Sequence, residues 1–173
     1  VYSQQFRWDA RYAGEDNTLG LGNVNYIKGI NTMGVDMNDV NSQDDKQVTE
    51  LYLPKGKKIH FKFRSQDVLH SAYMPHFRAQ MNCVPGMVTE FGFTPKYTTE
   101  EMRQQPEVIA KTKGINKIRK AKGEDAYEFD YLLLCNKICG ASHYSMQMKI
   151  TVVEQEDYDK WIAEQPTLAS VIK

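Results

Sequence analysis

The residues best suited to chemistry in this chain are concentrated in residues 135–146. This segment contains two cysteines four positions apart, Cys135 and Cys139, followed by His143 and Met146. Thiolate, imidazole and thioether are soft ligands, a set that suits copper better than magnesium, calcium or manganese. A mononuclear blue-copper site uses one cysteine, two histidines and a weak axial methionine, so the second cysteine needs an explanation. The simplest explanation is a pair of metal ions that share both thiolates, each ion being completed by one histidine.

This arrangement requires a second histidine from elsewhere in the chain. His70, within residues 67–71 (DVLHS), supplies it at the exit of a predicted strand, where a loop can present a ligand on a rigid scaffold. His60 lies on the polar side of an alternating pattern and is expected to face solvent. His76 is expected to be a surface or rim residue. His70 is therefore the histidine that the sequence offers as the second candidate ligand.

Several segments together resemble the binuclear copper (CuA) domain of cytochrome c oxidase subunit II. They are residues 67–71, Pro85-Gly86, and the pattern Cys135-x3-Cys139-Gly140-x2-His143-x2-Met146. Residues 5–12 (QFRWDARY) are similar to the aromatic segment that begins that domain. The resemblance implies two copper ions and a sixth contact from a backbone carbonyl. The implied ligand set is His70, Cys135, Lys137 (through its carbonyl), Cys139, His143 and Met146.

The same resemblance implies a role in a haem–copper terminal oxidase. A domain of this kind accepts electrons from a cytochrome c-type donor and passes them to a haem in subunit I, where oxygen is reduced to water. It performs no bond chemistry itself. The family carries transmembrane helices before this domain, so we expect a segment of a longer, membrane-anchored protein. Its expected location is the extracytoplasmic face of an energy-transducing membrane, with the bacterial periplasm favoured over the mitochondrial intermembrane space.

The chain departs from the family pattern at four positions. Lys137 stands where the oxidases have a glutamate that also helps to bind an interfacial magnesium ion, and lysine offers no acceptor for one. Phe6 stands where the first tryptophan of the aromatic segment serves as the point of electron entry, leaving Trp8 as the second aromatic. Asn82 and Met87 replace the usual aspartate and arginine around the Pro-Gly pair. The magnesium site and the route of electron entry are therefore the parts of the family pattern that these residues put in doubt.

Other interpretations of the cysteines remain open. A disulfide between Cys135 and Cys139 would leave the neighbouring imidazole and thioether without a purpose, and Cys83 is expected to be a small buried hydrophobe. Structural zinc also takes two cysteines and two histidines, but His70 upstream of both cysteines departs from the usual finger spacing. The functional alternatives are a copper-binding or sensing module and a zinc-stabilised binding domain, both without electron transfer. Nitrous oxide reductase, which also has a CuA domain, is a further electron-transfer alternative.

Composition is ordinary for a globular protein. The 173 residues are 41% hydrophobic and 25% charged, with a formal net charge of zero, so nothing points to a nucleic-acid partner. No run of 18 apolar residues and no Cys-x-x-Cys-His haem-attachment motif occurs. This length favours a single domain over residues 1–173.

Alternating apolar residues predict strands, and few helices are expected. The predicted strands cover residues 6–12, 48–53, 59–64, 88–93, 127–134 and 146–152, with a short one at 24–27 inside a long loop. A short helix is expected at 154–164. Residues 98–125 are charged and form a partly helical insertion, expected either to contact a partner or to be a solvated excursion. The predicted fold class is all-β, a cupredoxin-like Greek-key β-sandwich.

Overall fold

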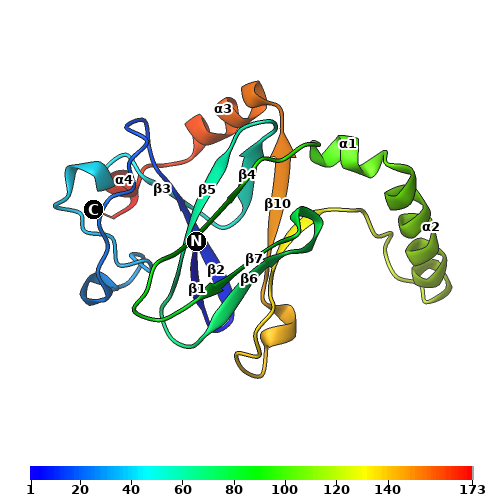
Figure 1. The fold of residues 1–173 in the computed structure, drawn as a ribbon, viewed down its shortest axis with the longest axis horizontal. Helices are drawn as coiled ribbons and strands as arrows, with labels where there is room; N and C mark the ends of the chain where they lie inside the picture. Colours follow the sequence, from blue (N-terminus) through cyan, green and yellow to red (C-terminus); the bar gives the residue numbers. More distant parts are fainter. Residues whose placement is uncertain (173) are drawn as a thin grey trace.

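The computed structural model describes residues 1–172, whose strands form two packed sheets of five strands each (Figure 1). The first sheet has the order β3 (Lys46–Val48), β2 (Arg7–Tyr12), β1 (Tyr2–Gln4), β5 (Ile59–Ser65), β8 (Thr89–Phe93). The second has the order β4 (Leu51–Pro54), β10 (Gln147–Val153), β9 (Tyr131–Cys135), β6 (His70–Met74), β7 (Ala79–Cys83). Strands β1 and β5 pair in parallel, as do β4 and β10, and the other pairs are antiparallel. The predicted fold class, a mostly β sandwich of two sheets, is confirmed.

The two sheets pack through the apolar face of each alternating strand. In β5, Phe61 and Phe63 are buried while His60, as predicted, faces solvent. In the opposite sheet Leu133 and Ile150 are fully buried in the same hydrophobic cluster. Burial of this apolar surface is the main stabilising contribution to the sandwich, and it holds rigid the strands from which the candidate metal ligands project.

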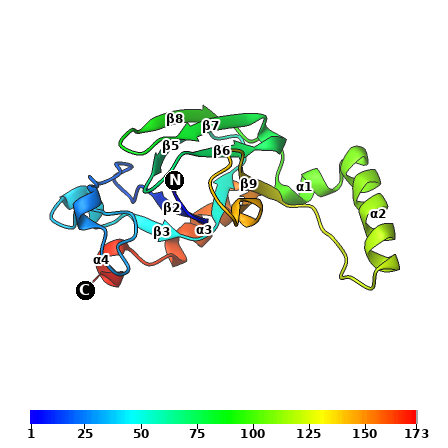
Figure 2. The same cartoon turned by 90° about the horizontal axis from the view of Figure 1, so that it is seen from below.

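The insertion forms an arm that projects from one end of the sandwich (Figures 1 and 2). It consists of α1 (Thr99–Arg103) and α2 (Pro106–Ala121), so the predicted partly helical character is confirmed. Thr98 and Glu101 form a reciprocal capping box at the start of α1, and Pro106 occupies the first turn of α2, where its missing N–H costs nothing. Asn116 joins α2 to the segment that leads back to β9. Its side-chain amide donates a 3.0 Å hydrogen bond to the carbonyl of Tyr127 and accepts one of 2.6 Å from the N–H of the same residue.

Helix α3 (Gln155–Glu164) matches the predicted C-terminal helix, and a short α4 (Leu168–Val171) follows. Short 3-10 turns occur at η1 (Val24–Tyr26), η2 (Val40–Ser42), η3 (Pro75–Phe77) and η4 (His143–Ser145). Within residues 1–172, no helix combines the length and apolar character that crossing a membrane requires.

Three predicted strands are wrong in detail. Residues 24–27 do not form a strand, because the side chain of Asn23 caps a 3-10 turn by accepting a hydrogen bond from the N–H of Asn25. Residues 48–53 are divided between β3 and β4, which belong to different sheets. The strand predicted from residue 127 begins only at Tyr131, because the backbone of Tyr127 is hydrogen-bonded to Asn116 of α2 rather than to a neighbouring strand.

Candidate metal centre

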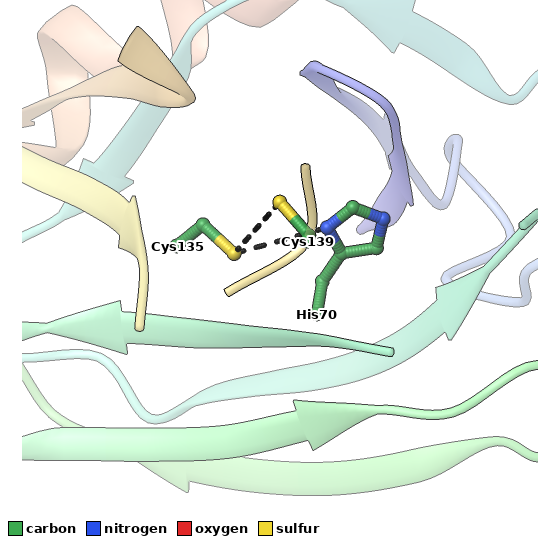
Figure 3. A group of neighbouring side chains, drawn as sticks. All are labelled: His70, Cys135 and Cys139. Carbon is green, nitrogen blue, oxygen red and sulfur yellow. Dashed lines mark hydrogen bonds between the residues drawn. The ribbon is translucent and has the colours of Figure 1, made fainter. Parts of the chain in front are cut away.

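The candidate ligands His70 and Cys135 are delivered by adjacent strands of the second sheet. His70 begins β6, rather than lying in the preceding loop as predicted, and its side chain is fully buried. Cys135 ends β9 and pairs in register with Ala72 of β6. The segment after Cys135 then turns back to β10 and places Cys139 beside His70 and Cys135. Figure 3 shows the side chains of His70, Cys135 and Cys139 converging.

Each of the six candidate ligands has its donor atom within 3.9 Å of the donor atom of at least one other, and the donors of His70, Cys135 and Cys139 all lie within 4.8 Å of one another. Cys135 Sγ is 3.8 Å from His70 Nδ1, 3.8 Å from Cys139 Sγ and 3.2 Å from the carbonyl oxygen of Lys137. Cys139 Sγ is 3.6 Å from His143 Nδ1 and 3.9 Å from Met146 Sδ. Two donors bound at about 2.3 Å to one tetrahedral ion lie about 3.7 Å apart, so these spacings suit metal ions placed between the donors.

The separation of the two sulfurs does not fit a disulfide. A disulfide S–S bond is about 2.05 Å long, whereas the observed separation is 3.8 Å and both cysteines are free. Cys83 is fully buried, as predicted for a small hydrophobe, and faces His70 across β6 and β7. Strand β6 separates it from Cys135, and two inter-strand spacings amount to about 9.5 Å. Cys83 is therefore too far from Cys135 for a disulfide, which needs Cα atoms within about 7 Å.

Asp67 fixes the orientation of His70, a role that the sequence interpretation did not assign. Its Oδ1 lies 2.8 Å from His70 Nε2, which leaves Nδ1 directed at Cys135. The carboxylate also accepts hydrogen bonds of 2.7 Å from the N–H groups of Gln5 and Val68. Burial opposes ionisation, but the bonds from Gln5, His70 and Val68 together hold the pKa of Asp67 below its usual range. A carboxylate placed behind a metal-binding histidine commonly sets its tautomer and ring orientation, and an acidic residue three positions before the histidine was the available signal.

The turn between β1 and β2 contacts the turn that carries Cys139. Gln5 Nε2 donates a 2.5 Å hydrogen bond to the carbonyl of Cys139. The ring of Phe6 lies against Gly140, where an added Cβ would be 2.7 Å from the ring carbons. Gly140 also has φ of +143°, a conformation that residues with side chains rarely adopt. The aromatic segment and the Cys-Gly dipeptide are thus fitted to each other.

Trp8 makes a second link between the sheets at this centre. Its indole Nε1 lies 3.5 Å from the carbonyl oxygen of Met146, and its ring meets the imidazole of His70 edge-on at 6.2 Å between centroids. Trp8 is almost fully buried. One side chain of β2 therefore contacts both segments that supply the candidate ligands from the second sheet.

Burial, together with the hydrogen bond and charge of Cys135, raises the pKa of Cys139 to about 11. Without metal, this thiol is protonated at neutral pH. Metal ions bind thiolates, so loading the site must release a proton here. His76 lies apart from the centre, packed edge-on against Phe129 at 4.8 Å between ring centroids.

Known proteins similar to this chain are named as subunit 2 of cytochrome c oxidases. The chain is 35% identical to the alternative cytochrome c oxidase subunit 2 of Bradyrhizobium diazoefficiens over 173 residues, which are 99% of this chain and 52% of that protein. It is 27% identical to cytochrome c oxidase subunit 2 of Alkalihalophilus pseudofirmus over 124 residues, which are 68% of this chain and 28% of the relative. No model of a protein family matches. The chain thus spans about half the length of the first relative and less of the second.

Among solved structures, the periplasmic domain of subunit II of the cytochrome oxidase of Bradyrhizobium japonicum is similar over 68% of this chain and 63% of its own, with 20% identity and a TM-score of 0.47. A mixed disulfide intermediate between a thioredoxin-like protein and subunit II of cytochrome c oxidase is similar over 94% of this chain and 84% of its own, with 17% identity and a TM-score of 0.49. No function follows from structural similarity at this level. The sequence relationship stands without it: over 99% of its length the chain is similar to a cytochrome c oxidase subunit 2.

Proposed function

We propose that this chain binds two copper ions in a binuclear CuA centre and transfers single electrons. The observation that carries the proposal is the convergence of two thiols, two imidazoles, a thioether and a backbone carbonyl at distances that suit shared ions. Cys135 and Cys139 would bridge the ions, His70 would complete one and His143 the other. Met146 and the carbonyl of Lys137 would provide the weaker contacts. Such a donor set is soft, which favours copper over hard cations.

The protein's own contribution is to hold these donors still. His70 is fixed by Asp67, and Cys135 lies at the end of a paired strand. The turn that carries Cys139 is clamped by Gln5. The bound copper pair would supply the capacity to accept and release one electron. Ligands held on both sides by sheet keep nearly the same positions in both oxidation states, which favours rapid electron transfer.

The family relationship extends the proposal to a complete oxidase. We infer that the chain is part of a longer membrane-anchored subunit on the extracytoplasmic side of a membrane, in the bacterial periplasm. There it would take electrons from a cytochrome c-type donor and pass them to haem in the catalytic subunit, where oxygen becomes water. The relatives named above are subunits of such oxidases, and their names support this extension.

Metal analysis and spectroscopy of the copper-loaded protein test the proposal. We expect two coppers per chain, a purple colour and the EPR signal of a mixed-valence copper pair. Cys135→Ser and Cys139→Ser are each expected to abolish the purple centre, whereas the control Cys83→Ser leaves it intact because Cys83 lies outside the centre. Fewer than two coppers in the fully loaded protein, one tightly bound zinc, or a normal spectrum in either bridging variant would refute the assignment.

A further inference from the structure

Lys137 brings its backbone to the candidate metal centre and leaves its side chain in solvent. Its carbonyl oxygen is 3.2 Å from Cys135 Sγ, yet the residue itself is exposed. Asn136 and Ile138, its neighbours in the chain, are exposed as well. The ammonium group of Lys137 is therefore carried on the outer surface of the turn whose backbone approaches the sulfurs.

No carboxylate among the described residues is paired with this ammonium group. Within residues 1–172, no aspartate or glutamate oxygen lies within 4.0 Å of Lys137 Nζ. The turn itself, residues 135–146, contains no acidic residue. Asp67 keeps its negative charge, but its two oxygens face the ring of His70 and two backbone N–H groups. Lys137 is thus an unpaired cation on the turn that carries the second cysteine.

The resemblance to cytochrome c oxidase implies a magnesium ion at the subunit interface beside this turn, but the residues here do not fit one. Mg²⁺ takes oxygen ligands in nearly octahedral geometry and is bound in proteins through carboxylates. The position that would supply the carboxylate holds an ammonium group, which has no lone pair to offer and repels a divalent cation. The carbonyl oxygen of Lys137 lies beside Cys135 Sγ instead. This turn therefore contributes no carboxylate ligand to a magnesium ion.

A covered lysine needs a counter-charge, whereas an exposed one does not. Ile138 and Tyr144, at 87% and 88% exposure, are the most exposed large apolar side chains within residues 1–172 and lie on the same turn. Such apolar surface is typical of a site that another protein covers. Under the proposed function, the catalytic subunit that receives the electrons must approach this turn closely. Its contact would bury the ammonium group of Lys137, which is strongly unfavourable unless an anion faces it.

We propose that the ammonium group of Lys137 takes the place of the interfacial magnesium ion and pairs with a carboxylate that the catalytic subunit presents at this turn. This inference rests on the proposed electron-transfer function and adds the chemistry of the subunit contact to it. Lysine is a compact point charge with three donors, so it binds carboxylate oxygens without the fixed geometry that a metal ion demands. The contact would then carry one covalently attached positive charge in place of an exchangeable divalent ion.

The test is whether the assembled oxidase holds a divalent cation at this contact. Cells that produce the complete oxidase are grown with Mn²⁺ replacing most of the Mg²⁺, and the complex is purified with its catalytic subunit. Manganese is counted by elemental analysis and detected by the EPR signal of the bound ion, and the copper spectrum confirms that the copper centre is loaded. We expect less than about 0.1 manganese per complex in the native oxidase, because Lys137 offers no ligand and repels the ion.

Charge reversal at Lys137 reveals the partner's carboxylate. Lys137→Glu places a carboxylate opposite the one proposed on the catalytic subunit, so it should gain about one manganese per complex. When a chelator removes that ion, two carboxylates face each other, and electron transfer from copper to haem should slow by about 3-fold or more. Lys137→Gln has neither charge and should bind no manganese. The matched control, Lys120→Glu, makes the same reversal on α2 and should gain neither manganese nor sensitivity to the chelator.

Three outcomes would overturn the inference. The first is one tightly bound manganese per complex in the native oxidase. The second is a Lys137→Glu oxidase that assembles with a loaded copper centre but takes up no manganese, since no carboxylate would then face this position. The third is an equal response of Lys137→Glu and Lys120→Glu to manganese and chelator. If Lys137→Glu fails to assemble, the native oxidase and Lys137→Gln still decide: one manganese per complex in either overturns the inference. A native oxidase without the spectrum of a copper pair would instead refute the proposed function itself.

Discussion

Substitution of Asp67 by asparagine tests whether the residue behind His70 sets the strength of the metal centre. In the native protein the carboxylate accepts three hydrogen bonds, at 2.8 Å from His70 Nε2 and at 2.7 Å from each of the N–H groups of Gln5 and Val68. An amide has one acceptor oxygen in place of two, so Asp67→Asn loses the negative charge and must leave one side of this cluster without an acceptor.

Loss of a carboxylate behind a metal-binding histidine typically lowers metal affinity by about 10- to 100-fold, or about 1.4 to 2.7 kcal/mol. We expect an effect in this range, because the imidazole keeps a neutral hydrogen bond at best. Copper affinity would be measured by titrating the loaded protein with a chelator and following the absorbance of the copper centre. Asp67→Ala, which removes every acceptor, should weaken binding further.

Asp157→Asn is the matched control, since it makes the same chemical change on the exposed side of α3. Its copper affinity should equal that of the native protein. If Asp67→Asn binds copper as tightly as the control and has the same reduction potential, the carboxylate has no part in positioning His70 and the reasoning fails.

Three further predictions concern the scaffold. Leu133→Ala leaves a cavity at a fully buried position two residues before Cys135, so it should lower the free energy of unfolding by about 2 to 5 kcal/mol in chemical denaturation. A loss below about 1 kcal/mol would show that the core around this residue is less tightly packed than described. Burial raises the pKa of Asp45 to about 6 against the partial compensation of Arg11, so the folded state binds the proton more tightly than the unfolded state. As pH rises from about 4 to about 6, the free energy of unfolding of the native protein should therefore fall by up to about 3 kcal/mol relative to that of Asp45→Asn, measured by chemical denaturation at each pH. A difference between the two proteins that stays constant across this range would contradict the raised pKa. Asn116→Ala removes both bonds to Tyr127, so hydrogen exchange should become faster in α2 while the copper spectrum is unchanged; unchanged exchange would show that the arm is held by other contacts.

The strands and the approach of the candidate ligands were predictable because both depend on local patterns. Alternation in residues 59–64 indicated a strand with one buried face, and β5 has that face. The spacing from Cys135 to Met146 indicated a turn that gathers soft donors, and the structure brings those donors together. These signals extend over a few residues and need no knowledge of distant contacts.

The contacts that the sequence did not reveal are those made between distant segments. Nothing local indicates that Gln5 donates to the carbonyl of Cys139, since the two are far apart in the chain and meet only when the sheets pack. The division of residues 48–53 between two sheets has the same origin, because apolar periodicity does not say which neighbour a strand will pair with. The turn at residues 24–26 was missed for the opposite reason, a local cap by Asn23 that competes with strand formation.

The contact of Trp8 with the candidate centre gives the protein an internal optical reporter. The chain has two tryptophans. The ring of Trp8 lies beside the imidazole of His70. Trp161 belongs to α3 and stacks on Tyr52 of β4, with 4.4 Å between the ring centroids. An open-shell ion quenches the emission of an indole a few ångström away much more strongly than that of a distant one. Fluorescence from Trp8 would therefore fall as copper binds. Fluorescence from Trp161 would report only on the packing of α3 against β4. Metal uptake and loosening of this helix could then be followed separately in one sample.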